Sequence, residues 1–531
     1  MMQPPAEPSP SGSRLARDSA VVGAATMLSR LLGFARDVLI ARLLGAGPVA
    51  DAFLAALRLP NLVRRVLGEG GLNAPFVPLY LDIKGSRGEA AARRFAGEAT
   101  AHLGLLLLVL IAFGEIFTPW LVLGLVSGFA NEPETLALAT QYTRLMLPFL
   151  LLTTLAALLA ALLNAERRFT TAALAPALMN AVLLGVLLIQ LSRGAEAMAS
   201  ASLLAIFVSL TGFTHLGLIL LRLRKIGLPR LSLRWSPDMS RLVRTGGATL
   251  LAASSAQLVL LVAMQIASTE GGAVAALYYA DRIFQLPLGF VGVAMGTVVL
   301  SEMAASRENA QDDAMLGRAL ALGLALAVPA AVALATLAEP IVSVLFEHGR
   351  FGAEDRARTA AALAAFALGL PFAVMAKVFG QVYFVRRMPR IPLLAGIAAV
   401  LVAACSGYGA ARGQDAATVA ALAASLAFVA QAVLLSLDLR RQGLWQPSLA
   451  SLRPIIAIMG ASAIMLGALL QLLPALTASL APGEPMLLRI TALVALCFGG
   501  LAAYGLTGAL FGAFDLPHLR LARASARTPR S

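Results

Sequence analysis

The sequence predicts an all-α polytopic membrane protein with about fourteen transmembrane helices. Of its 531 residues, 59% are hydrophobic and 13% are charged, whereas about a quarter of the residues in an ordinary soluble domain are charged. Apolar runs of about 20 residues, the length that crosses a bilayer as a helix, recur along the whole chain. The period-two alternation that is typical of transmembrane β-barrels does not occur.

Polar or Gly- and Pro-containing segments separate the apolar runs and give approximate boundaries. The predicted spans are 19–43, 48–68, 99–125, 136–163, 171–191, 199–221, 243–266, 273–302, 315–337, 359–384, 392–411, 416–438, 454–475 and 487–511. The domains that we expect from them are a cytoplasmic tail over 1–18, a six-helix lobe over 19–230, a second six-helix lobe over 231–445, two extra helices over 446–515 and a basic cytoplasmic tail over 516–531.

Two pairs of short motifs indicate that the lobes are repeats. Ala-Asp occurs at 50–51 and 280–281, and Leu-Pro-Phe occurs at 147–149 and 370–372, with offsets of 230 and 223 residues. Six predicted helices separate the equivalent positions. The repeats should therefore run in the same direction, related by a pseudo-two-fold axis along the membrane normal.

The net charge of +14 fits the positive-inside bias of membrane proteins. Lys and Arg gather in alternate loops and in the last residues of the chain, whereas the intervening loops 127–135 and 268–272 contain neither. Both termini are therefore expected in the cytoplasm. The basic and aromatic patches of nucleic-acid-binding proteins do not occur, so no nucleic-acid partner is expected.

The residue types that usually bind metals or catalyse reactions form no recognisable motif in this sequence. Cys405 and Cys497 are isolated in apolar segments and the four histidines are scattered, so neither a metal nor another cofactor is expected. The sequence contains no phosphate-binding P-loop and no hydrolytic signature. These observations predict a transporter rather than an enzyme, with no catalytic residues.

Charged side chains interrupt the first two apolar spans. A charged side chain at the centre of a bilayer costs about 2.5–3.5 kcal/mol on insertion scales. Such side chains must therefore face water, an ion-pair partner or an anionic substrate. The charged residues of these spans are Arg30, Arg36, Asp37, Asp51, Arg58, Arg64, Arg65 and Glu69.

Their spacing predicts faces of different character. Arg30 and Asp37 are seven residues apart, which places them on nearly one helix face. We expect that face, and the stripe that starts at Asp51, to hold ion pairs. Arg36 and Arg64 point about 100° away from these two faces of their helices. We therefore expect their guanidinium groups to be free of ion pairs. The eighth span adds Asp281 and Arg282, and Pro287 in that span and Pro60 in the second should break their helices locally.

Two interpretations of these arginines stay open. They could pair with Asp37, Asp51, Glu69 and Asp281 and only hold helices together. Arginines outnumber acids in the set, however, and surplus buried cations favour an anionic ligand. The planar guanidinium group matches phosphate oxygens bidentately. The set therefore favours a phosphate- or diphosphate-bearing substrate in a cavity between the lobes. Lys377 in the tenth span has no assigned role.

Several of these segments together resemble one known family. They are S-R-L-L-G-F-A-R-D at 29–37, G-A-G-P-V-A-D-A-F at 45–53, R-L-P-N-L-V-R-R-V-L-G-E-G at 58–70, Y-Y-A-D-R-I-F-Q-L-P-L-G at 278–289 and L-F-E-H-G-R-F at 345–351. They resemble the corresponding motifs of the MurJ (MviN) lipid II flippases, and the resemblance covers the whole chain, including the two C-terminal helices.

The resemblance implies a fold, a substrate and a site. The fold is that of the multidrug/oligosaccharidyl-lipid/polysaccharide exporters, and the substrate is lipid II, the undecaprenyl-diphosphate-linked peptidoglycan precursor of the bacterial inner membrane. The last two helices are expected to form an apolar groove for the lipid tail. The implied headgroup-binding residues are Arg30, Arg36, Asp37, Arg64 and Arg282. Asp51 and Glu69 match acidic positions that the family associates with ion pairing that depends on the transport state. Arg65, Asp281 and Gln285 complete the expected gating or ion-pair residues, and at Gln285 the chain departs from relatives that carry Glu.

We therefore expect a flippase that moves lipid II across the membrane by alternating access of its two lobes. Its partners would be lipid II, membrane lipids and proteins of cell-wall synthesis. One rival is a flippase for another polyprenyl-diphosphate glycan. A second is a cation-coupled drug antiporter of the same fold, which would need a lone buried acid, and the excess of arginine argues against it. A third is a scaffold for wall synthesis, which would not need charges within the membrane.

Overall fold

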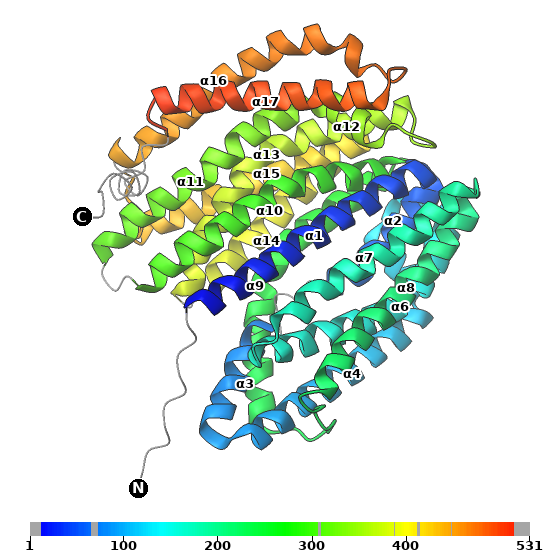
Figure 1. Cartoon of the computed structure of the whole chain (residues 1–531), viewed down its shortest axis with the longest axis vertical. Helices are drawn as coiled ribbons and strands as arrows, with labels where there is room; N and C mark the ends of the chain where they lie inside the picture. Colours follow the sequence, from blue (N-terminus) through cyan, green and yellow to red (C-terminus); the bar gives the residue numbers. More distant parts are fainter. Residues whose placement is uncertain are drawn as a thin grey trace. The chain divides into compact units, whose positions relative to one another are not determined.

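The computed structural model describes residues 12–64, 73–305, 309–386, 388–410, 415–447 and 449–513. Every long regular element in this part of the chain is an α-helix (Figure 1). The helices are α1 (Gly12–Leu44), α2 (Pro48–Val63), α3 (Asn73–Arg87), α4 (Glu89–Ile116), α5 (Thr118–Leu125), α6 (Pro133–Ala165), α7 (Phe169–Ser192), α8 (Ala197–Arg224), α9 (Pro237–Ala267), α10 (Ala273–Ala305), α11 (Asn309–Thr336), α12 (Ala338–Phe346), α13 (Ala353–Val385), α14 (Arg390–Ala410), α15 (Ala416–Arg441), α16 (Leu449–Leu476) and α17 (Met486–Leu510).

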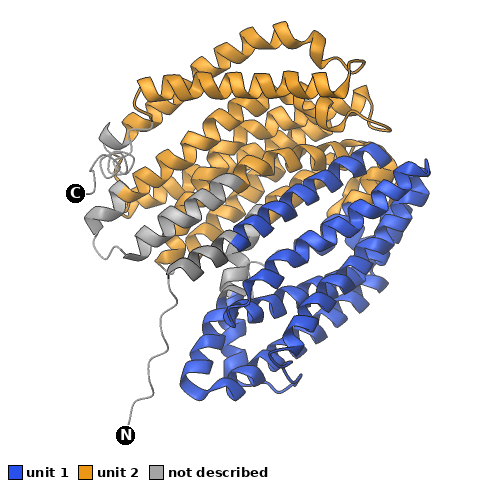
Figure 2. Cartoon of the chain, in the orientation of Figure 1, with its two compact units in different colours: residues 1–43, 55–122, 137–253 blue, residues 44–54, 123–136, 254–531 orange. Residues whose placement is uncertain are grey.

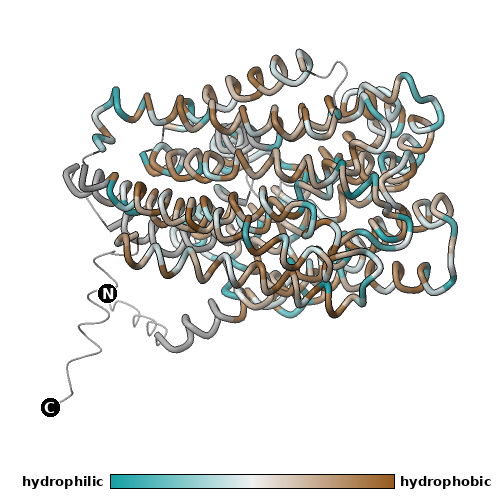
Figure 3. The backbone as a smooth tube through the Cα atoms, turned by 90° about the horizontal axis from the view of Figure 1, so that it is seen from above, coloured by the Kyte–Doolittle hydropathy of each residue, from teal (hydrophilic) through white to brown (hydrophobic). Residues whose placement is uncertain are grey.

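These helices confirm the predicted all-α class. Nearly all described residues of the predicted spans are helical, although the span 99–125 is divided between α4 and α5 and the end of the span 48–68 lies outside the described residues. Ten helices of the described chain are long and apolar enough to cross a membrane. The tube in Figure 3 shows hydrophobic residues along the helices and hydrophilic residues at many of the turns. The number of fourteen spans stays a prediction. Two short helices, α3 and α12, lie outside the predicted spans.

The expected helix breaks at the two prolines are wrong. Pro60 lies inside α2 and Pro287 lies inside α10, and both helices continue through them. Proline removes one backbone donor. Membrane helices tolerate this loss, because neighbouring groups and small local adjustments satisfy the backbone group that is left over.

The chain divides into two compact units, shown in different colours in Figure 2. Unit 1 comprises residues 1–43, 55–122 and 137–253. Unit 2 comprises residues 44–54, 123–136 and 254–531. The chain therefore passes from one unit to the other within α1, α2, α5, α6 and α9.

Unit 1 has an aromatic and ionic core around α3. The ring of Phe76 stacks on Tyr80 and on Phe95 of α4, with centroid distances of 6.0 and 5.5 Å. Glu166, directly after α6, accepts hydrogen bonds of 2.7 Å from Tyr80 Oη and Lys84 Nζ. Burial raises the pKa of Glu166, but these hydrogen bonds together with the positive charges of Lys84 and Arg93 outweigh it, so the pKa is lowered. The carboxylate therefore fastens α3 to the end of α6.

Unit 2 packs several helices closely through small residues. A Cβ atom on Gly369 of α13 would lie 2.6 Å from Ser425 Oγ and 2.8 Å from Ser425 Cα of α15. The Ser425 hydroxyl also donates a 2.8 Å hydrogen bond to the Ala365 carbonyl of α13. Small residues allow this close approach of helix backbones, which drives helix association in membranes.

The C-terminal helices α16 and α17 lie side by side in unit 2 (Figure 1). Val328 of α11 and Ile458 of α16 belong to one buried apolar cluster. The Tyr504 hydroxyl of α17 donates a 2.8 Å hydrogen bond to the Ala325 carbonyl of α11. The pair is thus attached to the remainder of unit 2 by both apolar and polar contacts.

We predict that Gly369→Ala destabilises the protein by about 1–3 kcal/mol, the usual cost of overpacking a core. The new methyl group would meet the backbone of Ser425, which cannot rotate away. Gly380→Ala in the same helix is the matched control, because the nearest atom to its new Cβ is 4.0 Å away. Thermal unfolding in detergent measures the effect. Equal melting temperatures for the two variants would contradict the packing argument.

Candidate functional site

The Arg36 guanidinium of α1 is held by two partners in unit 1. Its Nε and Nη2 atoms donate hydrogen bonds of 3.0 and 2.7 Å to Oδ1 of the adjacent Asp37. Its Nη1 donates a 3.0 Å hydrogen bond to Asn180 Oδ1 of α7. The Asp37 side chain is 2% exposed and that of Arg36 is 15% exposed. The expectation that the Arg36 guanidinium is free is therefore wrong, because neighbouring side chains on α1 reach one another around the helix.

Asn180 is a site residue that the sequence did not indicate. Its Nδ2 donates a 3.1 Å hydrogen bond to the Ser29 carbonyl of α1, so its amide connects α7 to both ends of the segment 29–37. A Cβ atom on Gly33 would lie 3.3 Å from Asn180 Nδ2. Glycine at this position therefore gives Asn180 the room to reach Arg36. The glycine in the motif was a visible signal, whereas the partner, 144 residues away in the sequence, was not.

The other predicted arginines of unit 1 differ in exposure. Arg30 is exposed on α1, and Arg58 is half-buried on α2. Arg64 is half-buried directly after α2 and interacts electrostatically with His215 of α8. Among the described site residues of unit 1, these arginines and Arg36 outnumber the one carboxylate, that of Asp37. Arg65 and Glu69 lie outside the described residues.

In unit 2, α10 carries a second group of the predicted residues. The Arg282 Nη2 donates a 2.6 Å hydrogen bond to the Tyr278 hydroxyl, and its guanidinium carbon lies 4.6 Å from the centre of the Tyr278 ring. This geometry combines a hydrogen bond with a cation–π contact. Asp281 is buried and accepts a 2.6 Å hydrogen bond from Gln285 Nε2. An amide at 285 can donate to Asp281, whereas an ionised carboxylate there could not.

Asp51 contacts a helix terminus rather than an arginine. Its carboxylate is fully buried and accepts hydrogen bonds of 2.6 and 2.7 Å from the backbone amides of Gly272 and Ala275, at the start of α10. The first amides of a helix lack partners within the helix and carry partial positive charge. Asp51 is expected from the sequence to support ion pairs or gating, and the hydrogen bonds of its side chain in the described chain are those of a helix cap.

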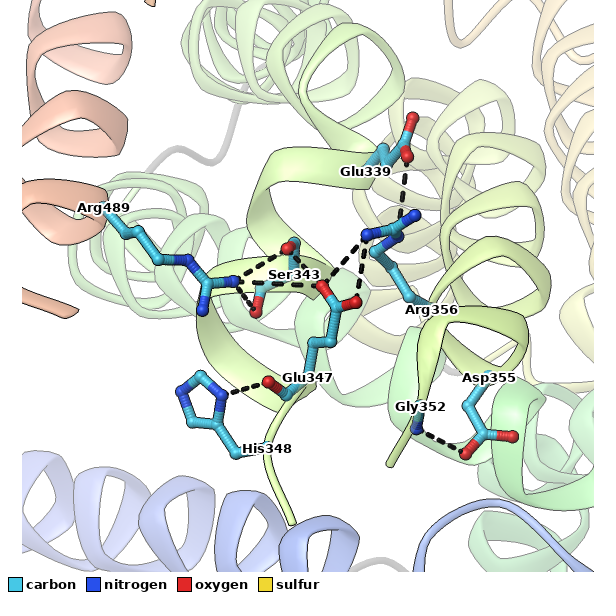
Figure 4. A network of polar contacts seen from close by, with 8 residues as sticks. All are labelled: Glu339, Ser343, Glu347, His348, Gly352, Asp355, Arg356 and Arg489. Atoms are coloured by element: carbon cyan, nitrogen blue, oxygen red, sulfur yellow. Dashed lines mark hydrogen bonds and ion pairs between the residues drawn. The ribbon is translucent and has the colours of Figure 1, made fainter. Parts of the chain in front are cut away.

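A second ionic network in unit 2 was missed by the sequence analysis (Figure 4). Arg489, in the first turn of α17, is 3% exposed. Its Nη2 donates 2.8 Å hydrogen bonds to the carbonyl and hydroxyl of Ser343 in α12 and lies 3.9 Å from Glu347 Oε2. Arg356 of α13 donates hydrogen bonds of 3.0 and 3.1 Å to the two Glu347 oxygens. Glu347 therefore connects arginines of two different helices.

The network gives the segment 345–351 a structural role, because it contains Glu347. The sequence analysis had identified this segment only because it resembles a motif of a known family. It also shows that α17 is not purely apolar, because its first turn is attached to α12 through a buried guanidinium. No group of three or more His, Cys, Asp or Glu residues in the described chain could hold a metal ion. Lys377 is exposed on α13.

We predict that Glu347→Gln destabilises unit 2 by about 3 kcal/mol, because breaking a buried pair leaves uncompensated charge. The amide keeps the shape but loses the negative charge that faces Arg356 and Arg489. Glu354→Gln is the control, since that side chain is 86% exposed and its pairing with Arg358 should contribute about 0–1 kcal/mol. Urea unfolding in detergent gives both values, and a loss for Glu347→Gln as small as the control would refute the buried network.

The chain is similar to the proteins of one known family. The family model described as lipid II flippase MurJ matches residues 40–490. A probable lipid II flippase MurJ of Rhizobium meliloti is 36% identical over 503 residues, which cover 92% of each chain. A lipid II flippase MurJ of Burkholderia cenocepacia is 31% identical over 83% of this chain and 87% of its own.

Solved structures show the same fold. A lipid II flippase MurJ in an inward closed conformation superposes with a TM-score of 0.75 at 24% identity and covers 93% of this chain and 99% of its own. An inward-facing MATE-family multidrug resistance transporter of the MOP superfamily has a TM-score of 0.62 at 15% identity, over 80% of this chain and 98% of its own. The family is one of membrane transporters, as the sequence predicted. The chain is thus a multi-pass inner-membrane protein that belongs to the MurJ lipid II flippase family.

Proposed function

We propose that the chain translocates lipid II from the inner to the outer leaflet of the cytoplasmic membrane. The observation that carries this proposal is the position of Arg36, a half-buried guanidinium in the first predicted span, held by Asp37 and Asn180. A transporter of apolar molecules would have no use for a cation that costs so much to insert. The direct test is a flipping assay on the reconstituted protein with lipid II of defined composition.

We propose that arginines of both units bind the diphosphate of the substrate. Arg36, Arg64 and the exposed Arg30 belong to unit 1, and Arg282 belongs to unit 2. The Arg282 guanidinium has five N–H groups in a planar fork that matches phosphate oxygens, and it donates one hydrogen bond to Tyr278. A diphosphate would accept several of these bonds at once. Transport would then alternate between states that present the arginines to either side of the membrane, with Asp51, Asp281 and Gln285 in supporting positions.

We further propose that both termini lie in the cytoplasm, that the lobes extend over 19–230 and 231–445, and that α16 and α17 hold the lipid tail. The alternation of basic and uncharged loops supports the orientation. Exposed apolar side chains on the pair, such as Ile456, Leu470 and Phe498, support the third proposal. Proteins of cell-wall synthesis are proposed as further partners.

A drug antiporter is the second candidate, because MATE transporters share the fold. A cationic drug would be repelled by the surplus arginines of unit 1, whereas an anionic lipid headgroup would be attracted. Competition separates the two candidates. Inhibition of lipid II flipping by soluble diphosphates but not by lipophilic cations supports the flippase, and the reverse result supports the antiporter.

We predict that Arg36→Lys loses most flipping, at least tenfold, although it keeps the charge. Lysine is a point charge, whereas arginine bonds to Asp37 and Asn180 through a planar fork. The initial rate of lipid II flipping in proteoliposomes is the measurement. The exposed Arg193→Lys, beyond the end of α7, is the control. Wild-type rates in a folded Arg36→Lys protein would mean that charge alone matters at this position.

We predict that deletion of 446–531 weakens binding of full-length polyprenyl substrates more than binding of a short-chain analogue. Each buried methylene contributes about 0.8 kcal/mol, so a long tail gains far more from an apolar surface. Affinities for the two analogues, measured on the folded deletion variant, decide the question. An equal loss for both would mean that α16 and α17 only stabilise the fold.

A further inference from the structure

The segment 226–236, which connects α8 to α9, lies against α4 of unit 1. Three pairs of residues establish this position. A Cβ atom on Gly227 would collide with Arg93, and a Cβ atom on Gly97 would collide with the Arg230 carbonyl. The Trp235 ring packs edge-on against His102 at a centroid distance of 5.1 Å. The segment therefore follows α4 from its charged first turns toward its apolar middle.

Trp235 lies beside the part of α4 where the charged first turns are followed by the apolar middle of the helix. The charged residues at the start of α4 end with Glu98, and the leucine-rich run 103–110 follows His102. Leu105, Leu106 and Leu108 of that run are exposed, as expected of side chains that face lipid. Tryptophan is enriched at this boundary in membrane proteins, because its ring is amphipathic. The Trp235 Nε1 donates a 2.7 Å hydrogen bond to Ser240 Oγ, so its polar edge is already satisfied.

The segment exposes apolar side chains that nothing in unit 1 covers. Leu231, Leu233 and Trp235 are 69%, 60% and 57% exposed. They alternate with Arg230 and Arg234, which are also exposed. In an extended chain, alternate side chains point to opposite sides. The alternation therefore predicts one apolar and one cationic side along 230–235.

The charge around the segment is positive. Arg224, Lys225, Arg230, Arg234 and Arg94 are exposed. The acidic groups nearby already have partners or are buried. Glu89 is bonded to Arg93 at 2.5 Å, Asp238 is bonded to Arg87 at 2.6 Å, and Glu98 is 8% exposed. The positive charge of the segment is thus left for a group outside the protein.

We propose that the segment 228–235 is a binding site for anionic phospholipid at the membrane surface. Leu231, Leu233 and Trp235 enter the boundary between headgroups and acyl chains, and Arg230 and Arg234 bind lipid phosphates. Arginine side chains extend from an apolar surface to the headgroup level in this way. Anionic lipids attract basic residues beside membrane spans. The site is separate from the arginines proposed to bind the substrate, and it does not depend on that proposal.

The test uses the full-length chain in vesicles with Trp235 as its one tryptophan. The sequence has three tryptophans, so Trp120→Phe and Trp445→Phe leave Trp235 as the probe. The vesicles contain equal parts of phosphatidylcholine and phosphatidylglycerol, and one of the two carries bromine on its acyl chains. The ratio of the two quenching strengths reports which lipid lies beside Trp235. We expect the brominated phosphatidylglycerol to quench more, with a preference that falls as salt rises.

Arg230→Gln with Arg234→Gln should lower this preference by about fivefold for each arginine. Arg440→Gln with Arg441→Gln, at the end of α15, removes the same charge elsewhere and should leave the preference unchanged. Leu231→Ser with Leu233→Ser should weaken quenching by both lipids. Two results would overturn the proposal. Equal quenching by both lipids would show apolar contact without headgroup binding. Quenching only by aqueous acrylamide, or by no agent because another protein covers the face, would show that lipid does not bind there.

Discussion

The structure depends on how guanidinium groups are stabilised among apolar helices. Arg36, Arg282 and Arg489 are stabilised by different kinds of partner. Arg36 is bonded to the adjacent Asp37 and to an amide from α7. Arg282 lies over an aromatic ring and bonds to its hydroxyl. Arg489 is bonded to a serine on another helix and lies near Glu347. At Arg36 and Arg489 a partner lies on another helix, so the electrostatic requirement and the packing of the helices are satisfied there by the same contacts.

The contacts that stabilise Arg36 are suited to an anionic substrate. Creating an unpaired charge in a low-dielectric environment costs several kcal/mol, whereas exchanging one anionic partner for another leaves the guanidinium paired throughout. On the proposed function, a diphosphate would share the Arg36 guanidinium with Asp37 while Asn180 keeps the side chain in place. At Glu347, by contrast, the one carboxylate is shared by two arginines from different helices, and the contact is better suited to holding α17 in place.

The sequence predicted the helices well because their signal is local. A run of about 20 apolar residues is sufficient to define a membrane helix, and nearly all described residues of the predicted spans are helical. It failed where partners come from distant parts of the chain. Asn180 and Ser29 are 151 residues apart, and Arg489 and Ser343 are 146 apart. No periodicity connects such positions. Helix α3 was missed because its segment contains Pro75 and Pro78 and reads as a loop.

The role of Asp51 follows from chain connectivity as well as from hydrogen bonding. Residues 44–54, which include the first part of α2, belong to unit 2, whereas α1 up to residue 43 and α2 from residue 55 belong to unit 1. This short segment is anchored twice at the start of α10. Asp51 accepts bonds from Gly272 and Ala275, and the Tyr279 hydroxyl donates a 3.0 Å hydrogen bond to the Gly45 carbonyl. Gly45, the residue that accepts the bond from Tyr279, has a φ of 72°, a backbone conformation that residues other than glycine rarely adopt.

Helix α2 begins in unit 2, where Asp51 anchors it to the start of α10, and ends in unit 1. The hydrogen bonds of Asp51 to the two backbone amides are 2.6 and 2.7 Å long, and the buried side chain would be left without these partners if they broke. Release of Asp51 therefore carries the cost of leaving a buried polar group unsatisfied, unless water or another donor replaces the amides. On this argument Asp51 sets the energetic cost of any transition that separates 44–54 from α10. That cost arises from burial and helix-terminal amides, whereas the sequence had predicted ion pairs along the stripe that starts at Asp51.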